Sequence, residues 1–315
     1  MNWMLIIMII VSILFYQLLR KTNKKMGKQN SIPNELPKLF MKYVEGGKFT
    51  PLGTGEEKEI FDMEVSQYLV TKKLFVEVKE YKLSGHEFNL FQDIMYTEPI
   101  KKLKGENKPV EMSYNNALLF CNKLSKIYKL EPVYNLSKLS EGIVIIGGLE
   151  VDIDKVDEFY FKNTEGFRLA TEWEWEYFAS GGKLSKRYKF PGSDDINEVA
   201  WYKKNSKGRI HDVGKKKPNE LELYDCAGNL AEWIFGVISK ENRWDRYVKI
   251  RVNTDSIANY KPMEREKVKR ITKGGTYMKD SDYCSVPSRI FYPYHQPINT
   301  GLRIVRTIKR NTNSF

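Results

Sequence analysis

Residues 218–233 read PNELELYDCAGNLAEW and hold the most informative group of polar side chains in the chain. Asp225 and Glu232 supply carboxylate oxygens, and Gly228 lies between them, where a turn can direct backbone carbonyl groups inward. Glycine adopts a positive φ without steric cost, and oxygen ligands on a tight loop suit a hard cation such as Ca²⁺. The simpler interpretation is an Asx-type turn followed by a strand or a short helix. The rest of the chain decides what the stretch means.

The composition indicates a packed globular protein. Of the 315 residues, 41% are hydrophobic and 13% aromatic, which argues against disorder. The three cysteines, Cys121, Cys226 and Cys284, are too few and too scattered for a disulfide framework, and no CxxC pair exists for zinc. The histidines lack HxxxH or HExxH spacing, so a histidine-rich iron or zinc site is not expected.

The net charge of +12 is concentrated in three basic blocks, at residues 20–28, 203–217 and 243–270. Such blocks can meet nucleic acid or anionic lipid. No nucleic-acid recognition motif accompanies them, so we expect no nucleic-acid partner and interpret the second and third blocks as solvated surface.

The N-terminus has the pattern of a membrane anchor. Residues 2–19 carry no charge, and about eighteen residues at ~1.5 Å each just span a bilayer core. A cleaved signal peptide would have a basic n-region and a small-residue cleavage site, and neither is present. We therefore predict a transmembrane helix at 1–19 and a basic, polar linker at 20–39. The positive-inside rule places the following domain in the cytoplasm, with an extracytoplasmic domain as the alternative.

Helix caps predict three helices in the part of the chain that follows. Thr71 caps one amphipathic segment and Ser113 another, whose apolar face carries Cys121 as a core residue. Thr171 and Glu174 form a capping box for a third helix, which ends at a pair of glycines. We attribute the three acids of its sequence TEWEWE to helix propensity and dipole complementarity rather than to acid–base catalysis. Strands are expected within 40–55 and 59–70, and a hairpin within 143–153.

The order of the sequence landmarks resembles one known family. The segments VEGGKFTPLG, YLVTKKLFVEV, KPVEMSYNNALLFCNKLS, GFRLATEWEWEYFASGG, FPGSDD, YDCAGNLAEW, ITKGGTYM and TGLRIVR follow one another in that order. Together they resemble the sulfatase-modifying-factor domain, also described as formylglycine-generating-enzyme-like, over residues 40–309, with a tail at 310–315. The resemblance implies a mixed α+β, C-type-lectin-like fold with modest regular secondary structure.

The resemblance also implies a structural Ca²⁺ site in the stretch quoted first. Its ligands would be the side chains of Asp225 and Glu232 and the backbone carbonyls of Gly228 and Leu230. The arginines of the GFR and GLR segments, Arg168 and Arg303, are interpreted as structural residues that satisfy buried carbonyl groups.

The chemistry of active family members depends on two cysteines whose thiolates bind Cu⁺. In this sequence Lys279 occupies the first of these positions and Cys284 the second. Soft sulfur ligands select Cu⁺, whereas a protonated lysine is not a ligand and its charge opposes metal binding. The sequence therefore argues against a copper site.

The resulting interpretation is a membrane-anchored, catalytically silent family member that binds a protein or peptide, such as a sulfatase-like protein. The family's peptide groove would be lined here by Tyr277, Tyr283 and Arg289, with Phe291 and Tyr292 as further aromatic residues. The alternative for these aromatic residues is the core. The alternative function is a formylglycine-generating oxidase, which would use O₂, copper and Cys284 to convert a sulfatase cysteine to Cα-formylglycine.

Overall fold

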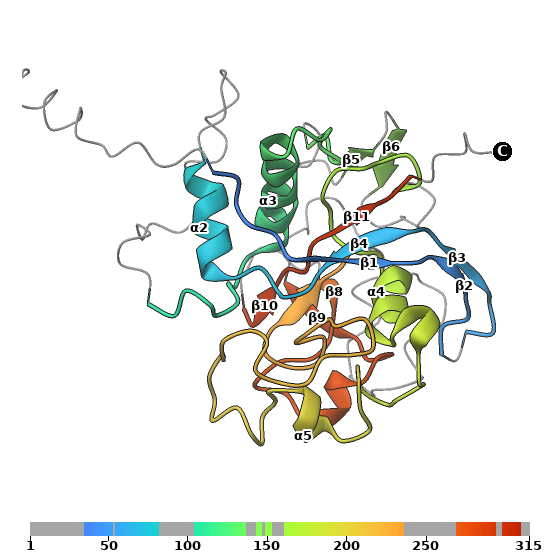
Figure 1. The fold of residues 1–315 in the computed structure, drawn as a ribbon, viewed down its shortest axis with the longest axis vertical. Helices are drawn as coiled ribbons and strands as arrows, with labels where there is room; N and C mark the ends of the chain where they lie inside the picture. The colour runs from blue at the N-terminus through green and yellow to red at the C-terminus, as the bar shows by residue number, and fades with distance from the viewer. Residues whose placement is uncertain are drawn as a thin grey trace, which may run out of the picture. The chain divides into compact units, whose positions relative to one another are not determined.

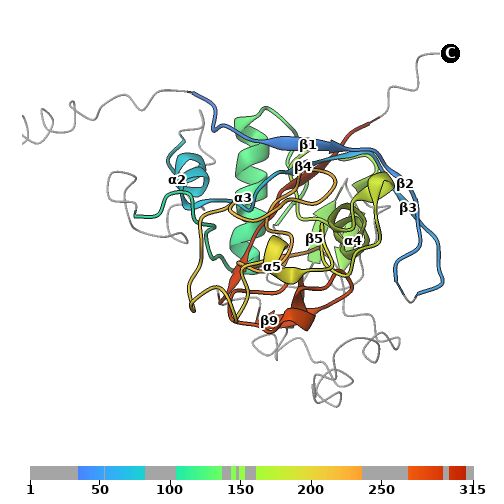
Figure 2. The same ribbon diagram turned by 60° about the horizontal axis from the view of Figure 1, so that its bottom comes forward.

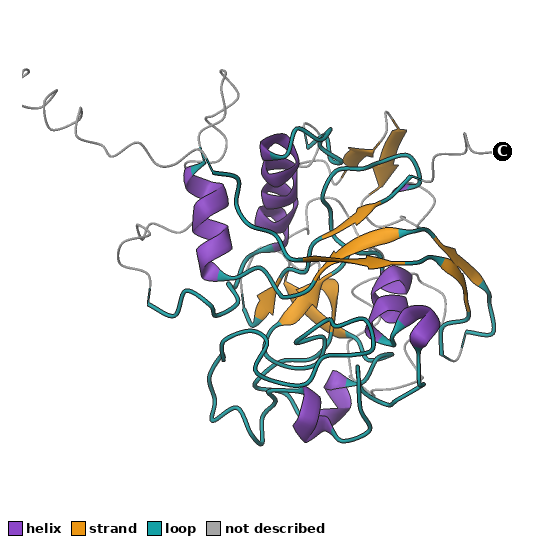
Figure 3. Cartoon of the chain, viewed as in Figure 1, coloured by secondary structure: helices purple, strands orange, loops and turns teal. Residues whose placement is uncertain are grey.

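A computed structural model describes residues 35–52, 54–81, 104–136, 143–146, 149–152, 161–235, 269–293 and 298–309. The chain divides into a segment of residues 1–36 and a compact unit of residues 37–315, and the fold described below is that of the compact unit. It is a mixed α+β structure in which loops take up much of the chain (Figure 3).

Two of the predicted helices are confirmed, with their caps. Helix α2, Lys72–Glu80, begins where the Thr71 hydroxyl accepts a 3.2 Å hydrogen bond from the Leu74 amide. Helix α3, Tyr114–Ile127, begins where the Ser113 hydroxyl accepts one of 3.3 Å from the Asn116 amide. The two helices pack side by side (Figures 1 and 2), because each turns an apolar face toward the other.

The third predicted helix, α4, is Glu172–Ala179 and has the expected capping box. The Thr171 amide donates to the Glu174 carboxylate at 2.9 Å, and the Glu174 amide donates to the Thr171 hydroxyl at 3.3 Å. Glu174 also forms a buried ion pair with Arg168, with two N–O distances of 2.7 Å. The sequence pattern predicted the cap, but it did not predict that Arg168 is the ion-pair partner of Glu174. Three further short helices are η5 Gly182–Leu184, α5 Ile196–Val199 and η8 Ser281–Cys284.

Two sheets organise the unit. In the three-stranded sheet, β4 lies between β1 and β11 and pairs antiparallel with both. In the four-stranded sheet, of order β10-β7-β8-β9, β7 pairs parallel with β10 and antiparallel with β8. The strands are β1 Met41–Val44, β4 Met63–Ser66, β7 Ala231–Trp233, β8 Lys269–Lys273, β9 Ile290–Pro293, β10 Thr300–Gly301 and β11 Val305–Thr307.

Two antiparallel strand pairs are the remaining strands among the described residues. Strands β2 Gly47–Phe49 and β3 Lys58–Ile60 form one pair. Strands β5 Ile143–Ile146 and β6 Leu149–Asp152 form the other, in the register that the predicted hairpin requires. The turn of that hairpin, residues 147–148, lies outside the described residues.

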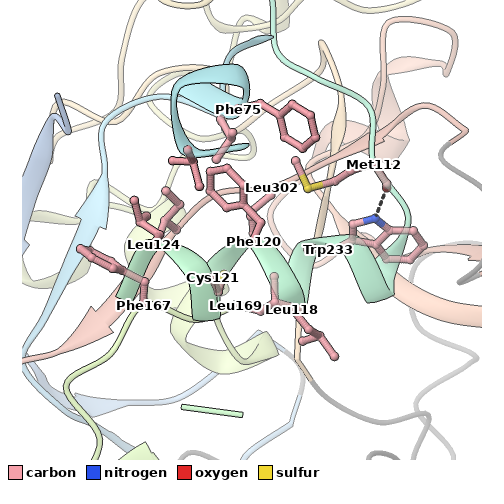
Figure 4. Packing of buried hydrophobic residues seen from close by; sticks show 14 of the residues in the cluster. Phe75, Met112, Leu118, Phe120, Cys121, Leu124, Phe167, Leu169, Trp233 and Leu302 are labelled. Atoms are coloured by element: carbon pink, nitrogen blue, oxygen red, sulfur yellow. Dashed lines mark hydrogen bonds between the residues drawn. The ribbon is translucent and has the colours of Figure 1, made fainter. Parts of the chain in front are cut away.

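The larger core cluster is formed by side chains of helices α2 and α3 together with Trp233 of strand β7 (Figure 4). Phe75 and Phe120 stack there with ring centroids 5.9 Å apart, and Trp233 donates a 2.7 Å hydrogen bond to the Met112 carbonyl. Cys121 is fully buried in this cluster, and burial raises the pKa of its thiol. The prediction that Cys121 is a core residue is therefore confirmed.

The predicted transmembrane helix lies outside the described residues, because residues 1–34 are not among them. Within the described part of the chain, none of the helices combines the length and the apolar character needed to cross a bilayer. The anchor at 1–19 stays a prediction of the sequence.

Burial of Lys123 predicts a measurable effect of pH on stability. Lys123 is 2% exposed, donates to the Lys79 carbonyl at 2.6 Å, and has a pKa that burial lowers to about 8. The unfolded chain retains this proton up to a pKa near 10.5, so folding becomes more favourable as pH rises from 8 to 10.5. Over this pH range, the titration of Lys123 raises the free energy of unfolding of the native chain by about 3 kcal/mol at most. We expect the Lys123→Met chain to lack this rise.

The measurement is urea denaturation of both chains at pH 7.5, 9 and 10.5, with the difference between them as the readout. The difference cancels the titration of the thiols and tyrosines that both chains share. Lys73→Met, at an exposed position on α2, is the matched control. A difference between native and Lys123→Met chains that does not change with pH would contradict the prediction.

Candidate functional site

The turn quoted first is confirmed as a tight loop with unusual backbone angles. Asp225, Gly228 and Asn229 have positive φ values of 57°, 72° and 59°. A Cβ atom on Gly228 would lie 2.2 Å from the Trp201 carbonyl oxygen, so only glycine fits there. The Gly228 amide donates at 2.7 Å to the Gly274 carbonyl, which joins this turn to the segment that carries Lys279 and Cys284.

Glu232, at the end of this turn, is paired with Arg303 in the interior. Both side chains are 1% exposed, and the guanidinium donates to both carboxylate oxygens at 2.8–3.0 Å. The Trp175 indole N–H donates to the same carboxylate at 2.7 Å. Arg303 also donates to the carbonyls of Ser66 and Tyr224, at 2.8 and 2.6 Å. The prediction that Arg303 satisfies buried carbonyl groups is confirmed, and its carboxylate partner is an additional finding.

Asp225 is buried in the same turn and uses both of its oxygens. One accepts the Gly214 amide at 2.7 Å, and the other accepts the Asn229 side-chain amide at 3.3 Å. Burial raises the pKa of this carboxyl group, and the Gly214 amide and the Arg303 charge oppose that rise. The carboxylate therefore holds the neighbouring loop, residues 211–214, against the turn.

The predicted Ca²⁺ ligands lie in one turn, but Glu232 does not fit the role in this arrangement. Each Glu232 oxygen accepts two N–H donors, and the Arg303 cation lies where its charge would repel a metal ion. No cluster of three or more His, Cys, Asp and Glu side chains suited to a metal ion occurs within the described ranges. Ca²⁺ binding by Asp225, Gly228, Leu230 and Glu232 stays a prediction of the family resemblance.

Cys284 ends the short helix η8 with its thiol in the interior. It is fully buried in a small apolar cluster, and a Cβ atom on Gly275 would lie 2.5 Å from its sulfur. Burial raises the pKa of the thiol to about 12. The group is therefore protonated at neutral pH and is enclosed by the protein, whereas the thiolate is the form that binds metals and attacks electrophiles.

Lys279, at the other predicted cysteine position, lies at the surface. Its ammonium group is 5.3 Å from the centroid of the Tyr283 ring. Its carbonyl accepts the Lys203 amide at 3.0 Å. No acidic side chain among the described residues forms an ion pair with the Lys279 ammonium. The two positions thus hold a surface cation and a buried thiol.

The aromatic residues of the predicted groove divide into two groups. Phe291 and Tyr292 pack against the two larger core clusters, so the core alternative applies to them. Tyr277 and Tyr283 are half-buried, and Met278 beside them is 53% exposed. Tyr277 is fixed by its backbone, since its amide donates to the Asn229 carbonyl at 2.9 Å and its carbonyl accepts the Ser206 hydroxyl at 2.7 Å.

Arg289, the third predicted groove residue, belongs to a network of buried charges. Its guanidinium donates to the Glu172 carboxylate, with one N–O distance of 2.7 Å. Lys273, fully buried, lies 3.6 Å from Glu172 and donates at 2.8 Å to Glu176. The acids of α4 that the sequence pattern assigned to helix stability therefore also anchor Lys273 and Arg289, in addition to the Arg168 partner of Glu174.

A basic loop at residues 203–217 adjoins this region and was interpreted from sequence as solvated surface. Here the His211 ring stacks on Trp201, with centroids 3.9 Å apart, and the Lys216 ammonium lies 4.3 Å from the Trp201 ring. Ser206 and Lys203 bond to the backbone of Tyr277 and Lys279. The run of lysines in the sequence indicated a basic surface. The sequence did not indicate that this surface lies beside Lys279.

A comparison with family models now assigns the domain. Residues 31–308 match the model described as the sulfatase-modifying factor enzyme 1-like domain. The chain belongs to this family. The family and the mixed α+β fold predicted from the sequence landmarks are confirmed.

Individual relatives share the family's fold at moderate to low identity. The chain is 29% identical over 290 residues to the chaperone protein LppX of Paenibacillus barcinonensis, covering 84% of this chain and 88% of that protein. Treponema denticola variable protein 1 is 26% identical with a TM-score of 0.52, covering 85% of this chain and 95% of the other. CarF, at 20% identity and a TM-score of 0.58, supports the fold alone and covers 87% of this chain and all of its own.

The Arg303–Glu232 pair predicts a large loss of stability for one substitution. Arg303→Met leaves the Glu232 carboxylate buried beside a single remaining donor, the Trp175 indole, and removes the donors to three carbonyl groups. Loss of one partner of a buried ion pair costs about 3–5 kcal/mol. We expect a loss of that size in the free energy of unfolding, measured by urea denaturation.

Arg306→Met is the matched control, because Arg306 pairs with Glu64 at the partly exposed surface of the three-stranded sheet. Exposed pairs contribute at most about 1 kcal/mol. Equal losses for the two variants would show that the Arg303–Glu232 pair has no special role.

The same geometry makes the predicted Ca²⁺ site testable. Because both Glu232 oxygens are engaged by N–H donors, we expect millimolar CaCl₂ to leave the Tm within about 1 °C of its value in EDTA. A clear rise in Tm, absent in Asp225→Ala, would instead establish the Ca²⁺ site that the family resemblance implies. Differential scanning fluorimetry with and without CaCl₂ decides between the two.

Proposed function

We propose that the protein is a membrane-anchored member of this family that lacks the copper dithiolate site and binds an extended segment of another protein. The observation that carries the proposal is the pair of positions 279 and 284. One holds the surface ammonium of Lys279, and the other holds the buried, protonated thiol of Cys284.

Copper oxidation needs two soft, ionised sulfur ligands that converge on one metal ion. Cys284 offers a single thiol whose pKa is raised to about 12, and the nearby turn closes over it through Gly275. The Lys279 ammonium supplies a positive charge and no soft ligand at the other position. These features oppose Cu⁺ binding, so the alternative function as a formylglycine-generating oxidase is the less favoured one.

The same segment offers a surface suited to a polypeptide. Met278 is 53% exposed and lies between the half-buried Tyr277 and the Lys279 side chain. Aromatic and methionine side chains are enriched where proteins meet other proteins, and a backbone fixed by hydrogen bonds lowers the entropic cost of binding. The relationship to a protein named as a chaperone supports a role in holding another polypeptide rather than in oxidation.

Membrane attachment is proposed from the uncharged residues 2–19, with the domain on the cytoplasmic side because the basic residues follow that segment. The extracytoplasmic alternative places the same surface where it meets secreted rather than nascent chains. A reporter fused after Phe315 distinguishes the two orientations.

The test combines oxidation and binding in one preparation of the full chain in detergent. A peptide with the sulfatase motif C-x-P-x-R is incubated with the protein, Cu⁺ and air, and mass spectrometry looks for the aldehyde. Binding of reduced, carboxymethylated α-lactalbumin, a permanently unfolded polypeptide, is measured by fluorescence anisotropy. We expect no aldehyde, and we expect Met278→Asp to weaken binding by roughly tenfold, as loss of one interface anchor does.

Two controls make the outcome specific. Leu184→Asp changes another exposed apolar residue, 61% exposed, and should leave binding unchanged. Aldehyde formation that disappears in Cys284→Ser would overturn the proposal in favour of the oxidase. Binding that survives Met278→Asp would move the binding surface elsewhere.

A further inference from the structure

The basic loop, residues 203–217, carries seven cationic side chains and one acidic side chain, Asp212. Three of the cations have partners. Lys203 pairs with Asp280 at 3.1 Å and Lys217 with Glu198 at 3.2 Å. Lys216 lies over the Trp201 ring and donates to the Asn197 carbonyl at 2.5 Å.

The other four cations of the loop are exposed, and they form no ion pair with any acidic side chain in the part of the chain that the structure describes. They are Lys204, Lys207, Arg209 and Lys215. A group of like charges without counter-charges raises the local potential and attracts an anionic partner.

The loop is held in one conformation by bonds to the neighbouring segments. The Ser206 hydroxyl donates to the Tyr277 carbonyl at 2.7 Å, and the His211 amide donates to the Asn229 side chain at 3.1 Å. The Gly214 amide donates to Asp225. Charges on a fixed loop select a partner by position, because the loop backbone is already ordered before binding.

Lys279 extends this set of unpaired cations. Its carbonyl accepts the Lys203 amide at 3.0 Å, so the start of the loop and the segment 277–280 run side by side. The acids that flank Lys279 in sequence are used by other lysines, Asp280 by Lys203 and Asp282 by Lys189 at 3.5 Å. Neither of these acids therefore compensates the charge of the Lys279 ammonium.

We propose that the surface formed by Lys279 and the basic loop binds an acidic segment of a protein partner. Carboxylates of the segment would pair with Lys279, Lys204 and Lys207, while an apolar side chain rests on Met278. A lysine ammonium is a compact point charge that accommodates carboxylates from several directions. This inference rests on the proposed function and adds the charge of the bound segment.

The exposed Met278 beside these charges favours a protein segment as the partner, because such a segment offers an apolar side chain together with carboxylates.

Three labelled decapeptides test the inference on the full chain in detergent. They share the same valine and tyrosine positions and carry glutamate, glutamine or lysine at the others. We expect the glutamate peptide to bind most tightly in fluorescence anisotropy, and its affinity to fall as salt rises from 50 to 300 mM, roughly the range over which screening of surface charges grows. The triple change Lys204→Gln, Lys207→Gln and Lys279→Gln should weaken it by about tenfold or more.

The matched control changes three exposed lysines outside this surface, Lys38, Lys129 and Lys162, to glutamine. It alters net charge equally and should leave affinity within about twofold, since only long-range screening differs. Equal loss in both triple variants would reduce the effect to net charge and overturn the inference.

The remaining outcomes separate this inference from the function on which it rests. If the glutamine peptide binds as well as the glutamate peptide, and the triple variant is unchanged, the acidic specificity is wrong while the binding function stands. If none of the peptides binds, the proposed function fails as well. Displacement of the glutamate peptide by phosphatidylserine vesicles or by an RNA oligonucleotide at lower concentration would replace the protein partner with a lipid or a nucleic acid.

Discussion

The buried pair of Arg303 and Glu232 is the constraint on which the rest of the structure depends. Glu232 belongs to the four-stranded sheet, and Arg303 lies between β10 and β11. The guanidinium also bonds to the carbonyl of Ser66 at the end of β4, and the Trp175 indole ties α4 to the same carboxylate. One charge pair thus joins both sheets and a helix. Because the pair is buried, loss of any of these hydrogen bonds would lower the stability of the fold, since a buried donor or acceptor without a partner costs free energy.

A second network of charges holds the segment of residues 274–289, which carries Lys279 and Cys284. Lys273 comes directly before that segment and Arg289 comes at its end, and both bind acids of α4. The backbone between them is therefore held at both ends on one helix, while its middle is bonded to the turn of Asn229. The support of this segment therefore does not depend on the side chain of Lys279.

Local features of the fold were predictable from the sequence, and pairings between distant residues were not. Caps such as Thr71 and Thr171 act over three residues, so the helices and their first residues followed from the pattern. Glu232 and Arg303 are 71 positions apart, and nothing in either local segment names the other. Burial of Cys284 depends on side chains that converge from residues 190–227, and this convergence set its protonation state. For the same reason the basic character of the loop could be predicted from its composition, whereas its position beside Lys279 could be found only from the three-dimensional structure.

The arrangement of the three-stranded sheet has a consequence for biosynthesis. The central strand β4 emerges early and pairs with β1, but its second partner, β11, is among the last residues of the unit to be made. Until then β4 presents an open edge, and open strand edges recruit other chains. The three-stranded sheet is therefore completed only after residues 305–307 have been made. A nascent chain that stalls before residue 303 would lack both the final strand and the central cation, which makes this stage the period of greatest exposure to aggregation and proteolysis.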